Sequence, residues 1–240
     1  VSTQGIVFKT VKYSETSVVA TIYTEKMGVQ SYMVNSVRTK RAKTKMALLQ
    51  PLTLLDMVVY HREHRAIQRA KEIKLAYVFT TIPFDIVRST VALFITEVLY
   101  KTIKEEESNA GLFEFLAQFI QYLDQTPNSV ANLHLAFLLR LSSFLGFFPQ
   151  NNFFYTERAI FDMTEGQFTY RSSNKTPIIG LPLSEKLSLL MALPIHQSHT
   201  LKLKKEARKA LLRSLIVYYS LHVESVKEIQ AVKVLETVLG

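Results

Sequence analysis

The residues with the clearest chemical potential form a basic run between positions 37 and 45. Five of the eight residues from Arg38 to Lys45 are lysine or arginine, and no acidic residue occurs between Lys26 and Leu55. Cations at this spacing repel one another until a polyanion neutralises them, and a backbone of phosphates is the usual polyanion. The run therefore predicts a nucleic-acid-binding loop, although a solvated loop that aids solubility has the same composition.

Most of the positive charge lies in the same third of the chain. Residues 1–80 contain 13 Lys/Arg and 5 Asp/Glu, whereas residues 81–240 contain 16 and 15. This asymmetry favours one domain that binds nucleic acid and a second domain with another role. Further cations that extend the basic face are Lys9, Lys12, Arg62, Arg65 and Arg69. Tyr13, Tyr23 and Tyr32 offer rings for base stacking, with packing in the sheet as the alternative.

The elements that carry these residues have the pattern of short β-strands. Alternating and β-branched residues predict strands at 4–13, 18–24, 29–36 and 52–60, and residues 67–78 form a fifth strand or a partly irregular segment. Gly28 is free to take a positive φ in the turn before the third strand. Five short strands with basic loops predict a small barrel or sandwich of the kind that binds oligonucleotides.

Helical spacing of apolar residues follows from position 85 onward. Asp85 is a candidate N-cap, and helices are predicted at 87–99, 112–123 and 133–145, with Gly146 ending the third. The three carboxylates at 105–107 point in different directions from a helix end, which favours a solvated end over a metal site. Arg140 lies within the third apolar stretch. It suits a peptide with a hydrophobic side chain and a carboxylate, unless it lies on the polar face or pairs with an acid.

The last third combines a hairpin with more helices. Residues 159–163 and 167–170 predict a short hairpin, residues 171–182 a linker, and residues 184–193, 204–222 and 225–238 helices. A second basic cluster begins the long helix, and nearby acids balance it, so we expect at most a minor role in DNA binding. Its members are Lys202, Lys204, Lys205, Arg208 and Lys209.

The composition excludes several classes of site. The chain has no cysteine, which rules out disulfides, thiolate zinc sites and cysteine nucleophiles, and fits a reducing cytosol. The seven glycines are too far apart for a Walker loop, a dinucleotide fingerprint or a GxSxG elbow. The pairs His61/His64 and His196/His199 lack the HExxH pattern. No signal peptide or membrane span is evident, and we expect a non-enzymatic cytoplasmic protein.

Short stretches along almost the whole chain match one known family. They are QGIVFKT at 4–10 with Tyr13, Ser14 and Glu15, YTEKMG at 23–28, the basic run followed by LQPL at 49–52, LGFFP at 145–149, and IFD at 160–162. These stretches resemble the bacterial recombination mediator family RecO, most strongly over the first 60 residues. The resemblance implies an α+β protein with an N-terminal OB-fold barrel at 1–80. It implies a helical domain at 81–240 with a hairpin module near 153–171.

The resemblance also implies a function and partners. Proteins of this family bind single- and double-stranded DNA, anneal complementary strands, and help a recombinase replace single-strand-binding protein. The implied partners are RecR and the acidic C-terminal tail of single-strand-binding protein, and the implied location is the bacterial cytoplasm, with the nucleoid during repair. The DNA-binding residues would be Arg38, Lys40, Arg41, Lys43, Lys45, Lys9 and Lys12. The tail would bind Arg140 with Phe137, Leu141 and Phe144.

One departure from the family concerns zinc. Many members carry a four-cysteine zinc module after the Gly-Phe-Phe-Pro region, whereas residues 150–170 contain no cysteine. We therefore expect no metal and no cofactor, and a module held by packing of Phe153, Phe154, Tyr155 and Phe161. Two other hypotheses remain open from the residues alone: a non-catalytic adaptor whose basic loop docks an acidic partner, and a zinc-free hydrolase or nuclease.

Overall fold

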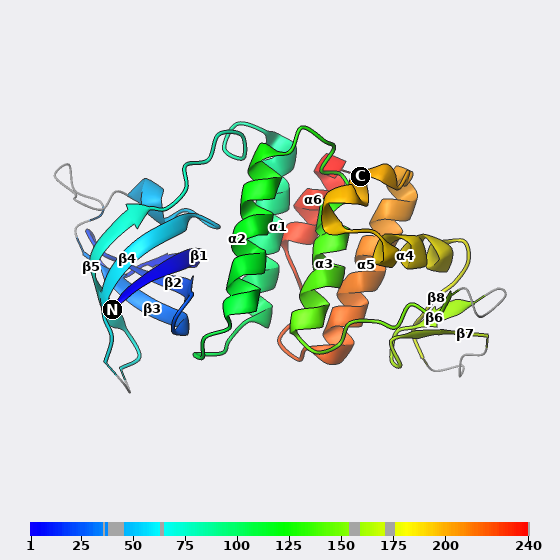
Figure 1. Cartoon of the computed structure of the whole chain (residues 1–240), viewed down its shortest axis with the longest axis horizontal. Helices are drawn as coiled ribbons and strands as arrows, with labels where there is room; N and C mark the ends of the chain where they lie inside the picture. Colours follow the sequence, from blue (N-terminus) through cyan, green and yellow to red (C-terminus); the bar gives the residue numbers. More distant parts are fainter. Residues whose placement is uncertain (36, 38–45, 63–64, 154–158, 171–175, 240) are drawn as a thin grey trace. The chain divides into compact units, whose positions relative to one another are not determined.

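The computed structural model describes residues 1–35, 37, 46–62, 65–153, 159–170 and 176–239 of the 240-residue chain. The chain divides into two compact units, residues 1–125 and 126–240 (Figure 1). The first unit contains a β-barrel and two helices, and the second contains helices and a small sheet. The predicted α+β class is therefore confirmed. The first compact unit extends to Gln125, and the predicted domain boundary after residue 80 lies inside it and stays a prediction.

The first unit begins with a closed five-stranded barrel. Its strands are β1 (Ser2–Lys12), β2 (Val18–Thr24), β3 (Gly28–Val34), β4 (Leu54–Tyr60) and β5 (Gln68–Leu75). They pair in the order β1-β2-β3-β5-β4, with β4 also paired to β1. All pairs are antiparallel except β3 with β5, which closes the barrel through parallel pairing. This arrangement confirms the predicted oligonucleotide-binding barrel.

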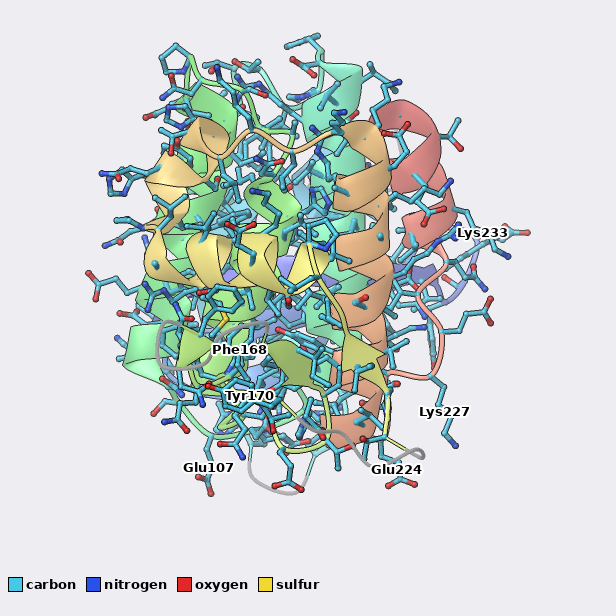
Figure 2. All side chains as sticks on the ribbon, turned by 90° about the vertical axis from the view of Figure 1, so that its right-hand side faces the viewer. Glu107, Phe168, Tyr170, Glu224, Lys227 and Lys233 are labelled. Carbon is cyan, nitrogen blue, oxygen red and sulfur yellow. The ribbon has the colours of Figure 1, made fainter. Side chains whose placement is uncertain are left out.

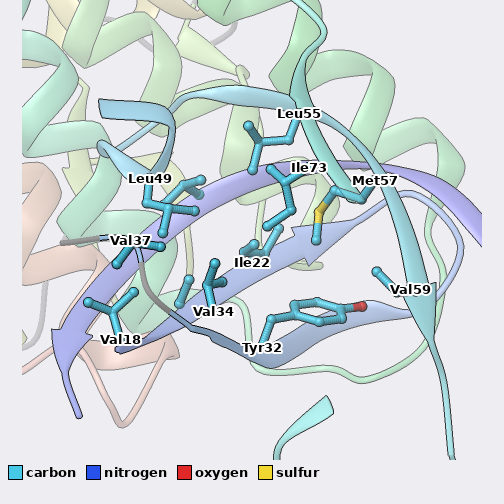
Figure 3. Close-up of a cluster of buried hydrophobic side chains, with 12 residues drawn as sticks. Val18, Ile22, Tyr32, Val34, Val37, Leu49, Leu55, Met57, Val59 and Ile73 are labelled. Atoms are coloured by element: carbon cyan, nitrogen blue, oxygen red, sulfur yellow. The ribbon is translucent and has the colours of Figure 1, made fainter. Parts of the chain in front are cut away.

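Alternation along the strands builds the barrel core. In β3, Gln30, Tyr32 and Val34 are buried, whereas Val29, Ser31 and Met33 are partly exposed on the outer face. Figure 3 shows the buried set as one cluster inside the barrel, with side chains from all five strands. Each fully buried aliphatic side chain contributes about 1.5–3 kcal/mol to folding. A side chain on the wrong face would lose this energy, so the alternation fixes which residues face outward.

Two of the three tyrosines considered for base stacking are core residues. Tyr23 and Tyr32 are 1% and 0% exposed, and the Tyr32 ring points into the barrel (Figure 3). Burial raises the pKa of each hydroxyl to about 12, and nearby Glu105 adds to the effect at Tyr23. For both residues the alternative of packing in the sheet is confirmed, because their strand positions belong to the inward face. Tyr13 is 62% exposed, and its role stays a prediction.

Two antiparallel helices complete the first unit. They are α1 (Ile86–Thr102) and α2 (Ala110–Gln125), adjacent in Figure 1. The Asp85 carboxylate caps α1, as predicted, by accepting hydrogen bonds from the Val87 and Arg88 backbone N–H groups at 2.8 and 3.0 Å. The Arg88 guanidinium then donates to the Leu123 carbonyl near the end of α2. The capped start of α1 is thereby tied to the end of α2.

The turn between β2 and β3 joins the barrel to these helices. Gly28 has a φ of +60°, and a Cβ there would lie 2.4 Å from the Glu105 carbonyl oxygen and 2.5 Å from that of Glu107. The next residue, Val29, donates its N–H to the Glu105 carbonyl at 2.9 Å. Only glycine fits both the left-handed φ and this close backbone approach. The acidic segment 105–107 is therefore part of the barrel's surroundings, and not only a solvated helix end.

A buried carboxylate anchors the segment that leaves the barrel. Asp124 is 1% exposed and accepts five hydrogen bonds of 2.8–2.9 Å from residues 77–82. The donors are the N–H groups of Thr80, Thr81 and Ile82 and the hydroxyls of Tyr77 and Thr80. Burial alone would raise the pKa of Asp124, but these donors outweigh it and hold the pKa at about 2. The anchor keeps the linker on α2, within the first unit.

The second unit is mainly helical. It contains α3 (Leu133–Phe144), α4 (Leu183–Ala192), the short 3-10 helix η3 (Ile195–Thr200), α5 (Lys205–His222) and α6 (Ala231–Leu239). The helix predicted from 225 begins later, at Ala231. Val226 and Ile229 are buried in a turn, and their spacing of three residues is common to turns and helices. Periodicity alone could not separate the two.

A small sheet accompanies these helices. Strands β6 (Ile160–Asp162) and β7 (Gln167–Thr169) form the predicted hairpin. A third strand, β8 (Ile178–Ile179), pairs with the other edge of β6, so the prediction that residues 171–182 are only a linker was wrong. Two residues are too short for alternation to be visible in the sequence.

Aromatic rings hold this sheet against α5. Phe161 of β6 contacts Phe168 of β7 and Tyr218 of α5, with ring centroids 5.1 and 5.6 Å apart. Phe153 also packs on Phe168, at 5.3 Å. Edge-to-face pairs of this kind are worth about 0.5–1.5 kcal/mol each beyond their buried area. The predicted packing of Phe153 and Phe161 is confirmed, whereas Phe154 and Tyr155 lie outside the described residues.

Candidate nucleic-acid interface and candidate peptide groove

The basic run itself lies outside the described residues, but both of its flanks belong to the barrel core. The prediction named Arg38, Lys40, Arg41, Lys43 and Lys45, and none of the five is among the described residues. Val37, just before the run, is buried in the barrel cluster, as is Leu49 of the short 3-10 helix η1 (Met46–Leu49). The Leu49 carbonyl also accepts a hydrogen bond from the Thr10 hydroxyl at 2.9 Å. The connection that carries the run is therefore fastened at both ends.

Two further predicted residues lie on β1. Lys9 and Lys12 are both exposed, and a β-bulge shifts the pairing register with β2 between Val7 and Lys9. The Lys9 ammonium lies 4.6 Å from the centroid of the Tyr100 ring on α1. A cation over an exposed aromatic face gains about 0.5–1 kcal/mol and keeps its charge. Lys9 is thus held in place while it remains available to an anion, and its role in DNA binding stays a prediction.

The Tyr100 ring is shared by a second cation. Lys104 places its ammonium 4.3 Å from the same ring centroid and donates to the Tyr100 carbonyl. Sequence reasoning missed Lys104, which it treated only as the end of a helix. The spacing of four residues between Tyr100 and Lys104 is a signal that was present in the sequence.

The loop between β4 and β5 adds more exposed cations. Arg62 and Arg65 lie in this loop and Arg69 lies on β5, and all three are exposed. The structure brings Arg62, Arg65 and Lys104 to one cavity of about 540 Å³, although they are separated by up to 42 positions. Arg69 is not among the described residues that line this cavity.

The groove next to Arg140 lies in the second unit. Arg140 is exposed on α3 and borders a shallow hollow whose other described lining residues are apolar. They come from α3, α4 and the segments that follow them: Ala136, Leu139, Phe148, Leu190, Met191, Leu193 and Ile195. A cation at the rim of an apolar hollow matches the predicted type of site for a hydrophobic residue next to a carboxylate.

The apolar residues predicted around Arg140 require a correction. Phe137 and Leu141 are both 0% exposed and pack inside the helical unit, so neither offers a surface to a peptide. Phe144 is partly exposed but is not among the described lining residues of the hollow. Positions 137, 141 and 144 share one face of α3, and burial assigns that face to the core. The hollow lies instead beside Ala136, Leu139 and Arg140.

Two of the five cations of the second basic cluster, Arg208 and Lys209, make contacts within the unit. Arg208 donates to the Asn132 side chain at 3.1 Å and to the carbonyls of Leu203 and Leu239 at 3.2 and 2.9 Å. Lys209 forms an ion pair with Glu236 at 3.3 Å. These contacts agree with the expectation of local balance. Lys202, Lys204 and Lys205 are exposed.

No metal or membrane feature is found in the part of the chain that the structure describes. Within residues 1–35, 37, 46–62, 65–153, 159–170 and 176–239, no three histidine or acidic side chains gather as ligands for a metal ion. No helix among the same residues has the length and apolarity needed to cross a membrane.

Comparison with known proteins identifies the family. The model for the recombination protein O N-terminal domain matches residues 1–79, and the model for its C-terminal domain matches residues 83–228. A DNA repair protein RecO from Flavobacterium psychrophilum is 35% identical over 100% of this chain and 99% of its own length. One from Bacteroides fragilis is 36% identical, over 98% and 97% of the two chains. The chain therefore belongs to the RecO family.

Proposed function

We propose that this protein is a recombination mediator in DNA repair, which binds DNA through its barrel and acts without catalytic turnover. One observation carries the proposal: a barrel of oligonucleotide-binding topology, within a full-length RecO family match, carries a run of five cations between two core-anchored flanks. Backbone phosphates are the polyanion that such a run fits. The finer activities proposed are annealing of complementary strands and loading of a recombinase onto DNA covered by single-strand-binding protein.

The test is a fluorescence-anisotropy titration with a labelled single-stranded oligonucleotide at several salt concentrations. Replacing Arg38, Lys40 and Arg41 by alanine should weaken binding and lower the slope of log K against log salt by about 2, since each phosphate contact on a single strand contributes about 0.7. The matched control replaces Lys227 and Lys233, two exposed lysines of the second unit (Figure 2). An unchanged slope in the triple variant would count against DNA binding by the run.

The hollow beside Arg140 is proposed as the site for the acidic C-terminal tail of single-strand-binding protein. Supporting observations are the exposed cation and the apolar lining from α3 and α4. A labelled peptide that ends in a hydrophobic residue with a free carboxylate should bind, and Arg140→Ala or amidation of that carboxylate should each weaken it about tenfold. If amidation has no effect, the carboxylate does not meet Arg140.

The proposal extends to double-stranded DNA and RecR as partners, in the bacterial cytoplasm and at the nucleoid during repair. The competing proposal is a non-catalytic adaptor whose basic run docks an acidic protein. The same titration separates them: binding to acidic peptides with no DNA affinity at low salt would favour the adaptor. DNA cleavage by the pure protein with Mg²⁺ would contradict the absence of catalysis.

A further inference from the structure

The cavity of about 540 Å³ on the barrel is lined mainly by charged and polar residues among those that the structure describes. Its described lining comes from the start of β3, the loop between β4 and β5 with the first residue of β5, and the residues just after α1. Among the described lining residues, Arg62, Arg65 and Lys104 are cations and Glu106 is a carboxylate, and the uncharged residues of this set are mostly polar. The volume lies within the range of about 300–1,000 Å³ usual for ligand sites. A polar cavity with excess positive charge suits an anion.

One buried side chain makes hydrogen bonds to the backbone of both arginines. Gln68 is 2% exposed, and its carbonyl oxygen accepts a hydrogen bond from the Arg62 N–H at 3.0 Å. Its amide nitrogen donates to the Arg62 carbonyl at 2.8 Å and to the Arg65 carbonyl at 2.9 Å. Gln68 also pairs with Tyr32 where β5 meets β3 and the barrel closes. The same residue that begins β5 thus holds the backbone of both arginines.

The other wall of the cavity is equally fixed. Lys104 is held against the Tyr100 ring, and the Glu105 carbonyl accepts the Val29 N–H. Ser31 lines the cavity from the partly exposed face of β3. Preorganised cations bind a phosphate without first paying the entropy of loop ordering. Both sides of the cavity are therefore built before any ligand arrives.

We propose that this cavity is a phosphate subsite for a DNA single strand, in which Arg62, Arg65 and Lys104 bind backbone phosphates and Gln68 is a positioning residue. The inference rests on the proposed DNA-binding function and places a contact outside the basic run. Its location agrees with the general use of the strand 2–3 face and the loop between strands 4 and 5 in oligonucleotide-binding barrels. Glu106 borders the same cavity and opposes phosphate, which keeps the contact weak enough to be reversed.

The subsite is expected to ignore base identity. Phe, Tyr and Trp are absent from the described residues that line the cavity, and the one ring among these residues is the imidazole of His61, so base stacking is a minor contribution there. Phosphate contacts fix position without reading sequence. An abasic oligonucleotide should therefore keep the part of the salt dependence that comes from this cavity.

The first experiment compares salt slopes in anisotropy titrations. Arg62→Ala with Arg65→Ala should lower the slope by about 1.4, because two single-strand phosphate contacts are lost. The change should be equal for normal and abasic oligonucleotides. Glu106→Gln should tighten binding two- to fivefold at low salt. The charge-matched control replaces Lys227 and Lys233, which should leave the slope unchanged.

The positioning role of Gln68 needs a separate variant. Gln68→Leu should lose the same slope as the double arginine variant although both arginines remain, with the barrel intact by circular dichroism. If Gln68→Leu fails to fold, Gln68→Met serves instead, because it keeps the length of the side chain and removes its hydrogen bonds without adding a charge. A folded Gln68 variant with the full wild-type slope would overturn the positioning role.

Cross-linking then tests the cavity itself. Because the chain has no cysteine, Ser31→Cys gives a single thiol in the cavity, and Ser220→Cys gives a control thiol exposed on α5. An oligonucleotide that carries a pyridyl disulfide should exchange with the thiol of the Ser31→Cys variant, which releases thiopyridone, and much less with that of the Ser220→Cys variant. Equal yields at both positions would overturn the subsite.

The results of these experiments distinguish a failure of the proposed subsite from a failure of the proposed DNA-binding function. If the Arg38, Lys40 and Arg41 variant lowers the slope while the Arg62 and Arg65 variant does not, DNA binding stands and the subsite is wrong. If wild-type protein does not bind DNA at low salt, both the proposed function and the subsite are wrong.

Discussion

In each unit, one charged side chain collects hydrogen bonds from a connecting segment, and the two charges have opposite signs. In the first, the buried carboxylate of Asp124 collects three backbone N–H groups and two hydroxyls from residues 77–82. In the second, the Arg208 guanidinium donates to two backbone carbonyls and to Asn132, whose amide nitrogen in turn donates to the Ser198 and Leu201 carbonyls. Each anchor fixes a connecting segment that has no regular hydrogen bonding of its own.

The difference appears in how each unit responds to acid. Asp124 has a lowered pKa of about 2 and stays charged until strongly acidic pH. His134, fully buried on α3, has its pKa lowered to about 3 by burial and by the charge of Arg208. A lowered carboxyl pKa stabilises a fold above pH 4, whereas a lowered histidine pKa destabilises it as soon as the unfolded histidine can take a proton. The helical unit should therefore weaken first on acidification.

The largest expected effect comes from removing the carboxylate anchor. Asp124→Ala should destabilise the first unit by roughly 4 kcal/mol, because five donors lose their acceptor. Asp124→Asn should cost less, about 2 kcal/mol, and should abolish the loss of stability that wild type shows as pH falls from about 4 to 2. Hydrogen exchange of peptides from residues 1–125 and 126–239 measures each unit separately. Equal loosening of both units would contradict the assignment of Asp124 to the first.

The second prediction compares alanine substitution at two glycines with a left-handed φ, one in each unit. Gly28→Ala should cost about 3 kcal/mol, since the φ of +60° is strained for alanine and the new Cβ would overlap the rigid backbone of residues 105–107. Gly166→Ala should cost about 2 kcal/mol. Its φ is +65°, but the group met at 2.9 Å is the hydroxyl end of the Tyr218 side chain. Thermal melts of both variants check the order, and a costlier Gly166 variant would reverse the comparison.

The acid response itself gives the third prediction. Below pH 6.5 the unfolded chain binds a proton at His134 that the folded chain rejects, so the second unit should lose about 1.4 kcal/mol per pH unit down to about pH 3. His134→Leu should remove most of this dependence, even if the variant is less stable at pH 7. Hydrogen exchange at pH 7 and pH 5 reports it. A first unit that loosens as much as the second between these pH values would contradict the contrast.

The smallest effect concerns buried tyrosine hydroxyls. The Tyr219 hydroxyl donates to the Leu138 carbonyl at 2.5 Å, so Tyr219→Phe should cost about 1–1.5 kcal/mol. The Tyr32 hydroxyl is buried in the barrel with no hydrogen-bond partner among the described residues. Tyr32→Phe should therefore be neutral or stabilise the barrel by up to about 1 kcal/mol. Denaturant unfolding of the two variants measures the difference, and a costly Tyr32→Phe would indicate an acceptor that the described residues do not include.

Much of the fold was predictable because its signals are local. Local patterns located four of the five barrel strands and left residues 67–78 open between a strand and an irregular segment, Asp85 marked the start of α1, and Gly28 marked a turn with positive φ. The sequence could not decide which face of a strand or helix packs into the core where both faces carry similar residues. Tyr23 and Tyr32, like Phe137 and Leu141, fit either an inward or an outward face, and only the assembled core decides between them.

The distribution of charge along the sequence was also only a partial guide to the structure. Splitting the chain at residue 80 placed the positive excess in the barrel, but residues 81–125 carry seven acids and three bases and belong to the barrel's own unit. The contribution of Lys104 and Glu106 to the cavity could not be predicted, because it depends on the close approach of residues 105–107 to Gly28. Contacts between segments more than 70 positions apart carry no local signal.

The anchored flanks of the basic run have a consequence for how this family can vary. Val37 and Leu49 are packed in the barrel core, one on each side of the run. Doubling the length of a flexible connection costs only about 0.6 kcal/mol in closure entropy. Mutation can therefore change the length or the charge of the run with little loss of folding stability. If the run binds DNA as proposed, DNA affinity and folding are free to evolve separately at this point of the chain.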